Sequence, residues 1–483
     1  MKAKCVMVLG TTSGAGKSWV STALCRYYAR RGLRVAPFKA QNMSNNARVV
    51  EGGEIGSAQY LQALAARAVP DVRMNPVLLK PEKDTRSQVV LLGQESRELS
   101  ALAWRRRSTR VWPAIAEAFD ALRAEHDVVV LEGAGSPAEI NLKPSDIVNM
   151  RMARHAKARC LLVTDIDRGG AFAHLYGTYQ LLDSAEQALI HGFVLNKFRG
   201  DASLLAPAPK MLEALTGVPT VATLPMWRHH GLPEEDGFFE VPGGSKASGE
   251  HIKTVAIVAY PRISNLDEFQ PLQNVPGVRL VWVRAPNQLN QLGHGDWIIL
   301  PGSKHTSGDL AWLRSQGLDR VIRAHAASGG AVLGICGGLQ MLGEVLVDPH
   351  GIDGEGSALG LLPLGTTFEA EKTVRRTRGR FERLRGPWAA LSGVEMAGYE
   401  IHHGRTELRR SGRGARPAMM DGLGWQNARG NVLALYLHGM FEDPRVTSAL
   451  FGAVTPTLDS VFDGLADYIA QHFRRGSLSS LIR

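Results

Sequence analysis

A glycine-rich loop near the N-terminus constrains the fold of this chain more than any other feature. Residues 5–9, CVMVL, predict a buried strand, and the loop GTTSGAGKS at residues 10–18 follows it directly. Apolar residues then recur at helical spacing from Val20 to Tyr28, so we expect an amphipathic helix that ends near Gly32. A strand, a glycine loop and a helix in this order predict a phosphate-binding loop on a parallel α/β sheet.

The loop assigns residues to a nucleotide site. We expect backbone N–H groups around Gly16 to hold phosphate, Lys17 to contact the β/γ-phosphates of ATP and the Ser18 hydroxyl to ligate Mg²⁺. The strict pattern GxxxxGK[ST] is not met because Gly10 lies one residue too early, and this longer loop is typical of the dethiobiotin-synthetase-like branch of P-loop proteins. Partition ATPases of that branch carry a signature lysine where this chain has Thr12, which disfavours that class.

Two acidic residues follow further apolar segments. Glu132 comes after residues 127–131, and Asp165 comes after residues 159–164. Acids at the carboxyl ends of parallel strands face the crevice where ligands bind, and carboxylate oxygens suit Mg²⁺. We therefore expect Glu132 and Asp165 to join Ser18 at a metal site, the alternative being solvated acids after buried strands.

The chain divides into two α/β regions. Short strands alternate with helical stretches through residues 1–231, which predicts an ATP-dependent domain with a parallel sheet covered on both faces. Residues 232–251 are polar, contain Gly and Pro and have no sustained period, so they predict a linker. A second α/β series then begins, and we assign residues 252–483 to a second domain.

Cys336 lies at a predicted nucleophile elbow in the second domain. It follows a buried strand, precedes a helix and has Gly334 and Gly338 two residues away on each side, as a strained strand–turn–helix nucleophile requires. The helix N-terminus favours the thiolate, and the N–H groups of Gly337 and Gly302 are candidates for an oxyanion hole. A buried inert cysteine is the alternative, although flanking glycines would pack it poorly.

A histidine is expected to act as the base for this thiol. His438 follows the apolar residues 432–437 and so lies where a sheet delivers a side chain to a crevice, whereas His402 and His403 are the other candidates. Glutamine amidotransferases of the triad type usually carry Glu two residues after this histidine, where this chain has Met440. The site is therefore either a Cys–His dyad or a triad whose acid comes from elsewhere in the chain.

Composition limits the classes of partner. No apolar run approaches the ~20 residues that span a bilayer, so we expect a cytoplasmic protein without membrane contact. Four cysteines without metal-ligand spacing predict neither a disulfide framework nor a cysteine metal site. The net charge of +10 is scattered along the chain, which favours attraction of anionic small molecules over nucleic-acid binding.

Longer motifs resemble one family over nearly the whole chain, the cobyric acid synthases. PFKAQNMSNN and EGAGSPAEINL are the most specific of them. The matching stretches are PFKAQNMSNN (37–46), EIGSAQ (54–59), MNPVLLKP (74–81), EGAGSPAEINL (132–142), DIDRGGAFAH (165–174), GFVLNKFRGD (192–201), LPEED (232–236), PRISNLDEF (261–269), LPGSKHT (300–306), GICGGLQMLG (334–343) and YLHG (436–439).

The resemblance implies a dethiobiotin-synthetase-like synthetase domain followed by a class-I-type glutamine amidotransferase domain that lacks the usual triad glutamate. It implies ATP- and glutamine-dependent amidation of the b, d, e and g carboxylates of adenosylcobyrinic acid a,c-diamide, with Mg²⁺ as cofactor. Cys336 would be the glutaminase nucleophile and His438 its base. Lys39, in PFKAQNMSNN, is a candidate to hold a substrate carboxylate or the phosphoryl group; a surface lysine is the alternative.

One residue departs from the family pattern, and two other functions stay open. Gly14 stands where the family loop commonly has Asp, so metal binding would depend on Glu132 or Asp165. The first alternative is a related amidotransferase that acts on the a,c-carboxylates or on a cell-wall lipid precursor. The second is a non-enzymatic P-loop switch with an inactive glutaminase domain, which an intact Cys336 and His438 disfavour.

Overall fold

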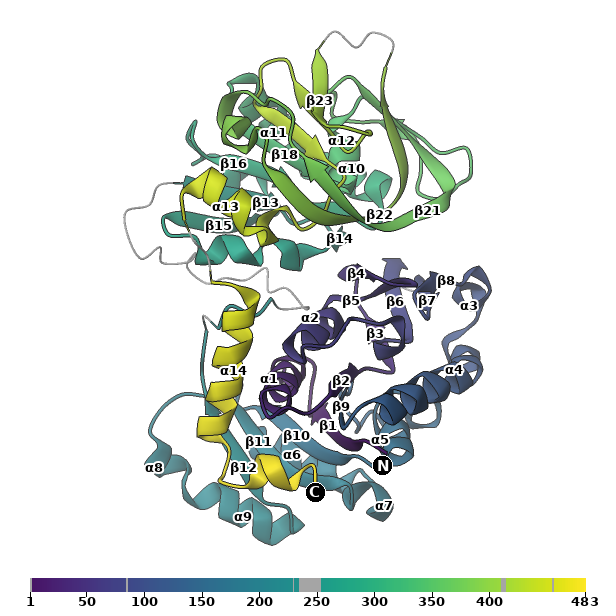
Figure 1. Cartoon of the computed structure of the whole chain (residues 1–483), viewed down its shortest axis with the longest axis vertical. Helices are drawn as coiled ribbons and strands as arrows, with labels where there is room; N and C mark the ends of the chain where they lie inside the picture. Colours follow the sequence, from purple (N-terminus) through teal and green to yellow (C-terminus); the bar gives the residue numbers. More distant parts are fainter. Residues whose placement is uncertain (1, 84–85, 229, 234–252, 410–413, 454–455) are drawn as a thin grey trace.

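The computed structural model describes residues 2–83, 86–228, 230–233, 253–409, 414–453 and 456–483. Two lobes stack along the long axis of the molecule, each built on its own central sheet (Figure 1). The predicted linker, residues 232–251, falls outside the described residues apart from its first two positions. The predicted fold class, two consecutive α/β domains with parallel sheets, is confirmed.

The first sheet has six strands in the order β12-β11-β10-β1-β9-β2, all paired in parallel. Along β1, Met7 and Leu9 join the hydrophobic core on one face, and Val6 and Val8 join the core on the other face. A strand buried on both faces is apolar throughout, which is why residues 5–9 lack polar alternation. The strands are β1 (Lys4–Gly10), β2 (Val35–Phe38), β9 (Val128–Glu132), β10 (Arg159–Asp165), β11 (Ile190–Phe198) and β12 (Thr220–Pro225).

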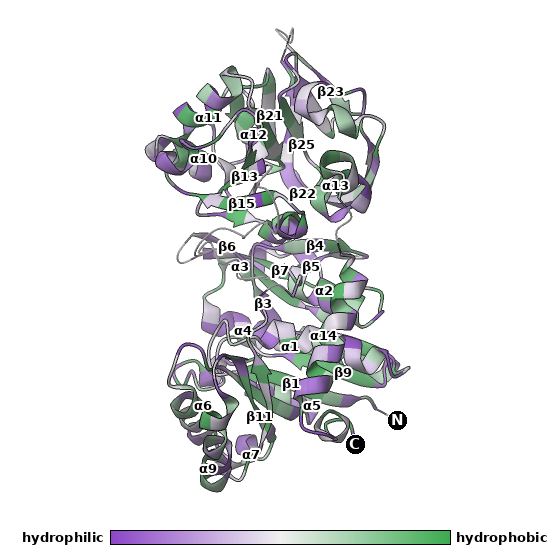
Figure 2. Ribbon diagram, turned by 90° about the vertical axis from the view of Figure 1, so that its left-hand side faces the viewer, coloured by the Kyte–Doolittle hydropathy of each residue, from purple (hydrophilic) through white to green (hydrophobic). Residues whose placement is uncertain are grey.

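Helices cover both faces of this sheet, and the apolar strands lie between them (Figure 2). One face is covered mainly by α4 (Trp104–Glu125), α5 (Met150–Ala156), α6 (Ala171–Gln180) and α9 (Pro207–Thr216). The other face is covered by α1 (Lys17–Ala29), α2 (Ser57–Ala65) and α14 (Leu458–His472). None of the helices in the described part of the chain has the length and apolar character needed to cross a bilayer.

The C-terminal segment returns to the first lobe, where the structure differs from the predicted division at residues 252–483. The yellow helix α14 lies beside the purple α1 (Figure 1). Phe462, Leu465 and Ile469 are buried in the core of the first domain, and Arg26 pairs with Asp463 at 2.8 Å. The amphipathic period of α14 predicts a helix with one buried face, but it does not say which sheet that face covers.

The second sheet has seven strands in the order β15-β13-β16-β18-β25-β24-β23. Its first five strands pair in parallel, and β24 and β23 add an antiparallel edge. The apolar residues 432–437 predicted from the sequence contain β25, which ends two residues earlier. The strands are β13 (Lys253–Val258), β15 (Val278–Val283), β16 (Trp297–Leu300), β18 (Ala331–Ile335), β23 (Ala415–Met419), β24 (Gly424–Asn427) and β25 (Val432–Leu435).

Helices lie around this sheet, and several of the remaining strands lie at the boundary between the lobes. The helices of the second domain are α10 (Thr306–Ser315), α11 (Leu318–Ala327), α12 (Gly337–Leu342) and α13 (Pro444–Phe451), with the 3₁₀ segment η3 (Leu266–Asn274). Strands at or near the boundary are β3 (Gln41–Met43), β4 (Ala47–Val50), β5 (Gly53–Gly56), β6 (Val77–Lys83), β7 (Arg86–Leu91), β8 (Gln94–Glu95), β21 (Leu364–Arg380) and β22 (Glu395–Leu408). The smaller elements are β14 (Ile263–Ser264), β17 (Gly302–Ser303), β19 (Val345–Val347), β20 (Gly356–Ser357), α3 (Arg97–Ala101), α7 (Ser184–Gln187), α8 (Ala202–Leu205) and α15 (Ser477–Ser480).

Candidate functional site

The glycine loop opens into a cavity of about 1150 Å³ at the carboxyl edge of the first sheet. Gly16 has φ of 104°, and a Cβ atom there would lie 2.1 Å from the Asn196 side chain, so only glycine fits this backbone. The Lys17 ammonium reaches back over the loop and donates to the carbonyl oxygens of Thr12 at 3.0 Å and Gly135 at 3.1 Å. The loop therefore has the curled shape, with its lysine inside, that phosphate binding requires.

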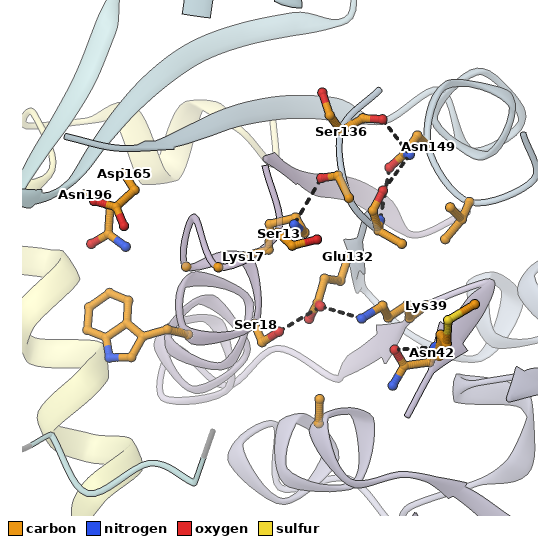
Figure 3. A pocket seen from close by; sticks show the side chains of 18 of the residues that line it. Ser13, Lys17, Ser18, Lys39, Asn42, Glu132, Ser136, Asn149, Asp165 and Asn196 are labelled. Carbon is orange, nitrogen blue, oxygen red and sulfur yellow. Dashed lines mark hydrogen bonds and ion pairs between the residues drawn. The ribbon is translucent and has the colours of Figure 1, made fainter. Parts of the chain in front are cut away.

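Glu132 binds two other predicted site residues, Ser18 and Lys39 (Figure 3). The Ser18 hydroxyl and the Lys39 ammonium each donate to its Oε1 atom at 2.8 Å. Gln62 donates to the other oxygen at 2.6 Å. Burial opposes ionisation of Glu132, but Lys39 and the neutral donors outweigh it and lower the pKa of this carboxyl. Lys39 is thus no exposed surface lysine, because it is buried and lines the cavity.

Asp165 lines the same cavity from the other side of β1. It ends β10, whereas Glu132 ends β9, and these two strands flank β1. Its carboxylate pairs with Lys197 at 3.0 Å and with Arg168 at 3.6 Å. Figure 3 shows Asp165 beside Asn196, away from the Ser18 and Glu132 pair. The structure therefore brings two of the three predicted metal ligands together and places the third apart from them.

Cys336 occupies a strained turn between β18 and α12. Its φ of 51° and ψ of −106° lie outside the regions that non-glycine residues ordinarily adopt. A Cβ atom at Gly334 would lie 2.7 Å from the Gly338 backbone, and one at Gly338 would lie 1.9 Å from the Leu300 carbonyl oxygen. The elbow therefore needs glycine at both positions, as the sequence predicted.

His438 lies against the Cys336 sulfur and against an acid that the sequence did not identify. Its Nδ1–H donates to Glu268 Oε1 at 2.9 Å, and its ring forms a hydrogen bond with the Cys336 side chain. Burial opposes protonation of His438, but the negative charges of Glu268 and Cys336 outweigh it and raise its pKa to about 10. A thiol beside a histidine that a carboxylate orients is the arrangement of a nucleophile with its base.

Glu268 takes the place of the missing triad glutamate. It belongs to η3, 170 residues before His438, and its second oxygen accepts the Gly439 N–H at 2.8 Å. Its side chain is completely buried, which for a carboxylate requires partners such as these. The signal that the sequence offered was the acidic pair Asp267-Glu268 within the family stretch PRISNLDEF.

The two predicted oxyanion residues lie on either side of this pair. A Cβ atom at Gly302 would lie 2.9 Å from the His438 ring, and one at Gly337 would lie 2.7 Å from the Ser303 nitrogen. The Ser303 N–H therefore lies beside Gly337, so Ser303 joins the candidates for the oxyanion hole. The sequence had placed Ser303 in the right loop without selecting it.

A second cavity, of about 1210 Å³, opens beside the thiol and is lined by both domains. His402 and His403 line it, but His402 is held by Glu400 at 3.1 Å and His403 by the Glu369 carbonyl oxygen at 3.1 Å. Met43 and Trp104 line both this cavity and the cavity beside the glycine loop, which we name the phosphate cavity. The two candidate sites are therefore separated by a wall that these side chains share.

Family models match both halves of the chain. Residues 6–234 match a CobQ/CobB/MinD/ParA nucleotide binding domain, and residues 254–446 match a CobB/CobQ-like glutamine amidotransferase domain. The cobyric acid synthase of Polaromonas naphthalenivorans (strain CJ2) is 73% identical over 486 aligned residues, which cover 100% of both chains. The chain belongs to the cobyric acid synthase family.

A further relative agrees with this assignment. The cobyric acid synthase of Variovorax paradoxus (strain S110) is 72% identical over 483 residues, again with 100% of both chains covered. The predicted family is thus confirmed, and so is the predicted enzyme class, a glutamine-hydrolysing amidating ligase. A non-enzymatic P-loop switch is excluded by the same findings.

Proposed function

We propose that this chain amidates the b, d, e and g carboxylates of adenosylcobyrinic acid a,c-diamide, using ATP for activation and glutamine as the nitrogen source. The observation that carries the proposal is the pairing of a phosphate-loop cavity with a Cys336–His438–Glu268 site across a shared wall. High identity to cobyric acid synthases over the full chain supports the corrinoid substrate. A related amidotransferase acting on another carboxylate is the second candidate.

The phosphate cavity would activate the carboxylate. Hydroxide is a poor leaving group and phosphate is a good one, so transfer of the γ-phosphoryl group of ATP to the carboxylate prepares the carbon for attack by ammonia. Catalysis of such a transfer is mostly positioning and charge stabilisation. Lys17 and the loop N–H groups would hold the phosphates, and Lys39, buried at the cavity wall, would hold the carboxylate or the transferring group.

The residues present fit a magnesium ion. The Ser18 hydroxyl and the Glu132 carboxylate lie 2.8 Å apart, and hydroxyl and carboxylate oxygens are the protein ligands that Mg²⁺ takes beside nucleotide phosphates. Ser18 and Glu132 would hold the ion, which supplies charge neutralisation for the phosphates when it is bound. Asp165, already paired with Lys197 and Arg168, would contribute less than Glu132.

The thiol site would release ammonia from glutamine. The Cys336 thiolate attacks the carboxamide carbon, the oxygen gains negative charge, and N–H groups of Gly337 and of Gly302 or Ser303 stabilise it. His438 then gives its proton to the departing ammonia, which leaves a thioester. Water hydrolyses the thioester with His438 as base, which restores the thiolate and yields glutamate.

Ammonia would cross from one site to the other through the shared wall. Ammonia released into bulk water at neutral pH becomes ammonium, which is not a nucleophile. Met43 and Trp104 are the residues common to both cavities, so the two cavities adjoin at these side chains. A path through this point would keep the ammonia unprotonated until it meets the activated carboxylate.

Replacing the nucleophile tests the two-site proposal. Cys336→Ala should abolish glutamine-dependent amidation while ammonium salts still support it, because the phosphate cavity is untouched. Mass spectrometry of adenosylcobyrinic a,c-diamide incubated with ATP, Mg²⁺ and either nitrogen source would show stepwise conversion of acids to amides.

The matched control is Cys5→Ala, which removes a buried thiol from β1 and should leave both activities near the wild-type level. Loss of the ammonium-driven reaction in a folded Cys336→Ala variant would contradict the two-site scheme. Amidation of a different carboxylate, with no change in the diamide, would favour the second candidate.

A further inference from the structure

Arg48 of the first domain is buried against acidic side chains of the second domain. It lies on β4, and its guanidinium pairs with Asp267 and, at 2.6 Å, with Glu442. It also donates to the Tyr399 hydroxyl at 2.8 Å. Only 3% of the Arg48 side chain is exposed, so this charge depends on its partners from across the domain boundary.

The partners of Arg48 lie beside the residues that hold His438 against Cys336. Asp267 precedes Glu268, the acid that binds His438. The Tyr399 ring stacks on the His438 ring, with centroids 5.2 Å apart and planes inclined by 19°. The His438 backbone N–H donates to the Tyr399 carbonyl oxygen at 2.9 Å. Arg48 therefore contacts two of the elements that set the position of the imidazole.

A reciprocal pair of hydrogen bonds fixes the same boundary just before Arg48. The Ala47 N–H donates to the Asn265 side chain at 2.9 Å, and the Leu266 N–H donates to the Asn46 side chain at 3.1 Å. Asn265 has φ of 53° and immediately precedes η3, the segment that carries both Asp267 and Glu268. The start of η3 is thus tied to the first domain.

The chain leads directly from the phosphate cavity to this contact. Lys39, Gln41, Asn42 and Met43 line that cavity, and β4 begins a few residues later with Ala47. Continuous backbone therefore connects the residues that line the phosphate cavity with Arg48.

We propose that Arg48 is a positioning residue that couples the seating of the two domains to the alignment of His438 and Glu268, so that glutamine is hydrolysed efficiently only when β4 is docked. The proposal rests on the proposed glutaminase chemistry of Cys336 and is independent of which carboxylate is amidated. The groups facing Arg48 are the carboxylates of Asp267 and Glu442, the Tyr399 hydroxyl and, behind them, Glu268.

The test compares Arg48→Met with wild type in the full chain. Glutamate release with ATP, Mg²⁺ and diamide present should fall roughly 10- to 100-fold in kcat, with a smaller change in KM, because a misplaced base slows chemistry more than binding. Ammonium-dependent amidation should stay within about threefold, because the phosphate cavity keeps its residues.

A second readout needs no corrinoid. The rate at which iodoacetamide alkylates Cys336, followed on its own peptide by mass spectrometry, should fall in Arg48→Met at neutral pH. The reaction depends on the His438 imidazole lying against the sulfur, and Arg48→Met loosens the residues that hold this imidazole. Wild-type protein that releases glutamate without amidating the diamide would overturn the substrate assignment and leave this inference standing.

Three variants isolate the role of Arg48. Arg48→Lys keeps the charge without the forked hydrogen bonds and should restore part of the glutaminase rate. Arg48→Met combined with Asp267→Asn removes the more deeply buried of the two carboxylates left without Arg48 but does not restore the lost contact, so it should stay as slow as Arg48→Met. Arg376→Met removes another arginine that contacts β4, through the Val49 carbonyl oxygen at 3.1 Å, and should change glutaminase less than about twofold.

Three results would overturn the proposal. The first is an unchanged ratio of glutamine- to ammonium-dependent activity in folded Arg48→Met. The second is a parallel loss of both activities, which would show a general structural role. The third is full recovery of glutamate release in the double variant, which would show that Arg48→Met acts only by leaving a buried carboxylate without its partner.

Discussion

The two candidate sites of this molecule are built in opposite ways. The phosphate cavity depends on a loop of consecutive residues, 10–18, together with acids at the ends of neighbouring strands of one sheet. The thiol site joins Cys336, His438 and Glu268, of which the last two are 170 residues apart, and it is tied to the other domain through Arg48. A site built from a contiguous loop is visible in the sequence, whereas a site assembled from distant segments is visible only in part.

The two sites also differ in the sign of their electrostatics. At the phosphate cavity an acid, Glu132, is held ionised by Lys39 and neutral donors. At the thiol site a base, His438, is held protonated by Glu268 and Cys336 despite its burial. The first arrangement suits binding of a cation with polyphosphate, and the second suits a resting thiolate.

Lys17→Met should have the largest effect and should separate the sites most clearly. Amidation should fall roughly 10³-fold with either glutamine or ammonium, because charge on the transferring phosphoryl group loses a fixed donor. Glutamate release should persist, since the thiol site is untouched. Lys4→Met, an exposed lysine at the start of β1, is the control. Equal loss of glutamate release and amidation would show that the sites are not separable.

Glu268→Gln should have the next largest effect, confined to glutamine. Glutamine-dependent kcat/KM should fall about 10²-fold, less than the ~10⁴-fold of a serine triad, because a thiolate needs less help than a hydroxyl. Ammonium-dependent amidation should be unchanged. Glu355→Gln, at an exposed position of the second domain, is the matched control. An unaffected glutaminase would show that Cys336 and His438 act as a dyad.

The same variant predicts a pH dependence of stability. The pKa of His438 is about 10 in the folded protein, above the ordinary value of 6.5. Its contribution to stability is therefore fully present below about pH 6.5 and is lost as pH rises towards 10. Glu268→Gln should lower the free energy of unfolding more at pH 6 than at pH 10, as measured by urea titration at the two pH values. An equal loss at both would contradict the raised pKa.

Ile469→Val should have the smallest effect. It tests whether α14 unfolds together with the first domain or with the second domain. Removing one buried methylene from the first-domain core should cost about 1 kcal/mol of unfolding free energy. The loss should appear in the urea transition that a non-hydrolysable ATP analogue raises, because ligand stabilises the domain that binds it. Gln471→Ala, on the exposed face, should change that transition by less than ~0.5 kcal/mol. A lower unfolding free energy in the other transition would show that α14 is part of the second domain.

Particular residues show how far sequence patterns reach. The strand–loop–helix order around Lys17 and the glycines around Cys336 predicted both local geometries, because each needs backbone conformations that few residues adopt. Glu268 could not be selected, because an acid beside an apolar residue is common and only the packing of η3 against β15 and against the turn at Met440–Glu442 brings it to His438. The sheet that α14 covers could not be predicted for the same reason, since its period reveals a buried face without its partner.

The sequence by itself determined the two α/β regions, the phosphate loop, the thiol elbow and the family, because local backbone preferences and long motifs depend on consecutive residues. The tertiary structure decided which acid orients His438, which sheet α14 completes and how Arg48 links the domains. These three contacts join residues more than 150 positions apart, and no local pattern encodes a contact that only the folded chain closes.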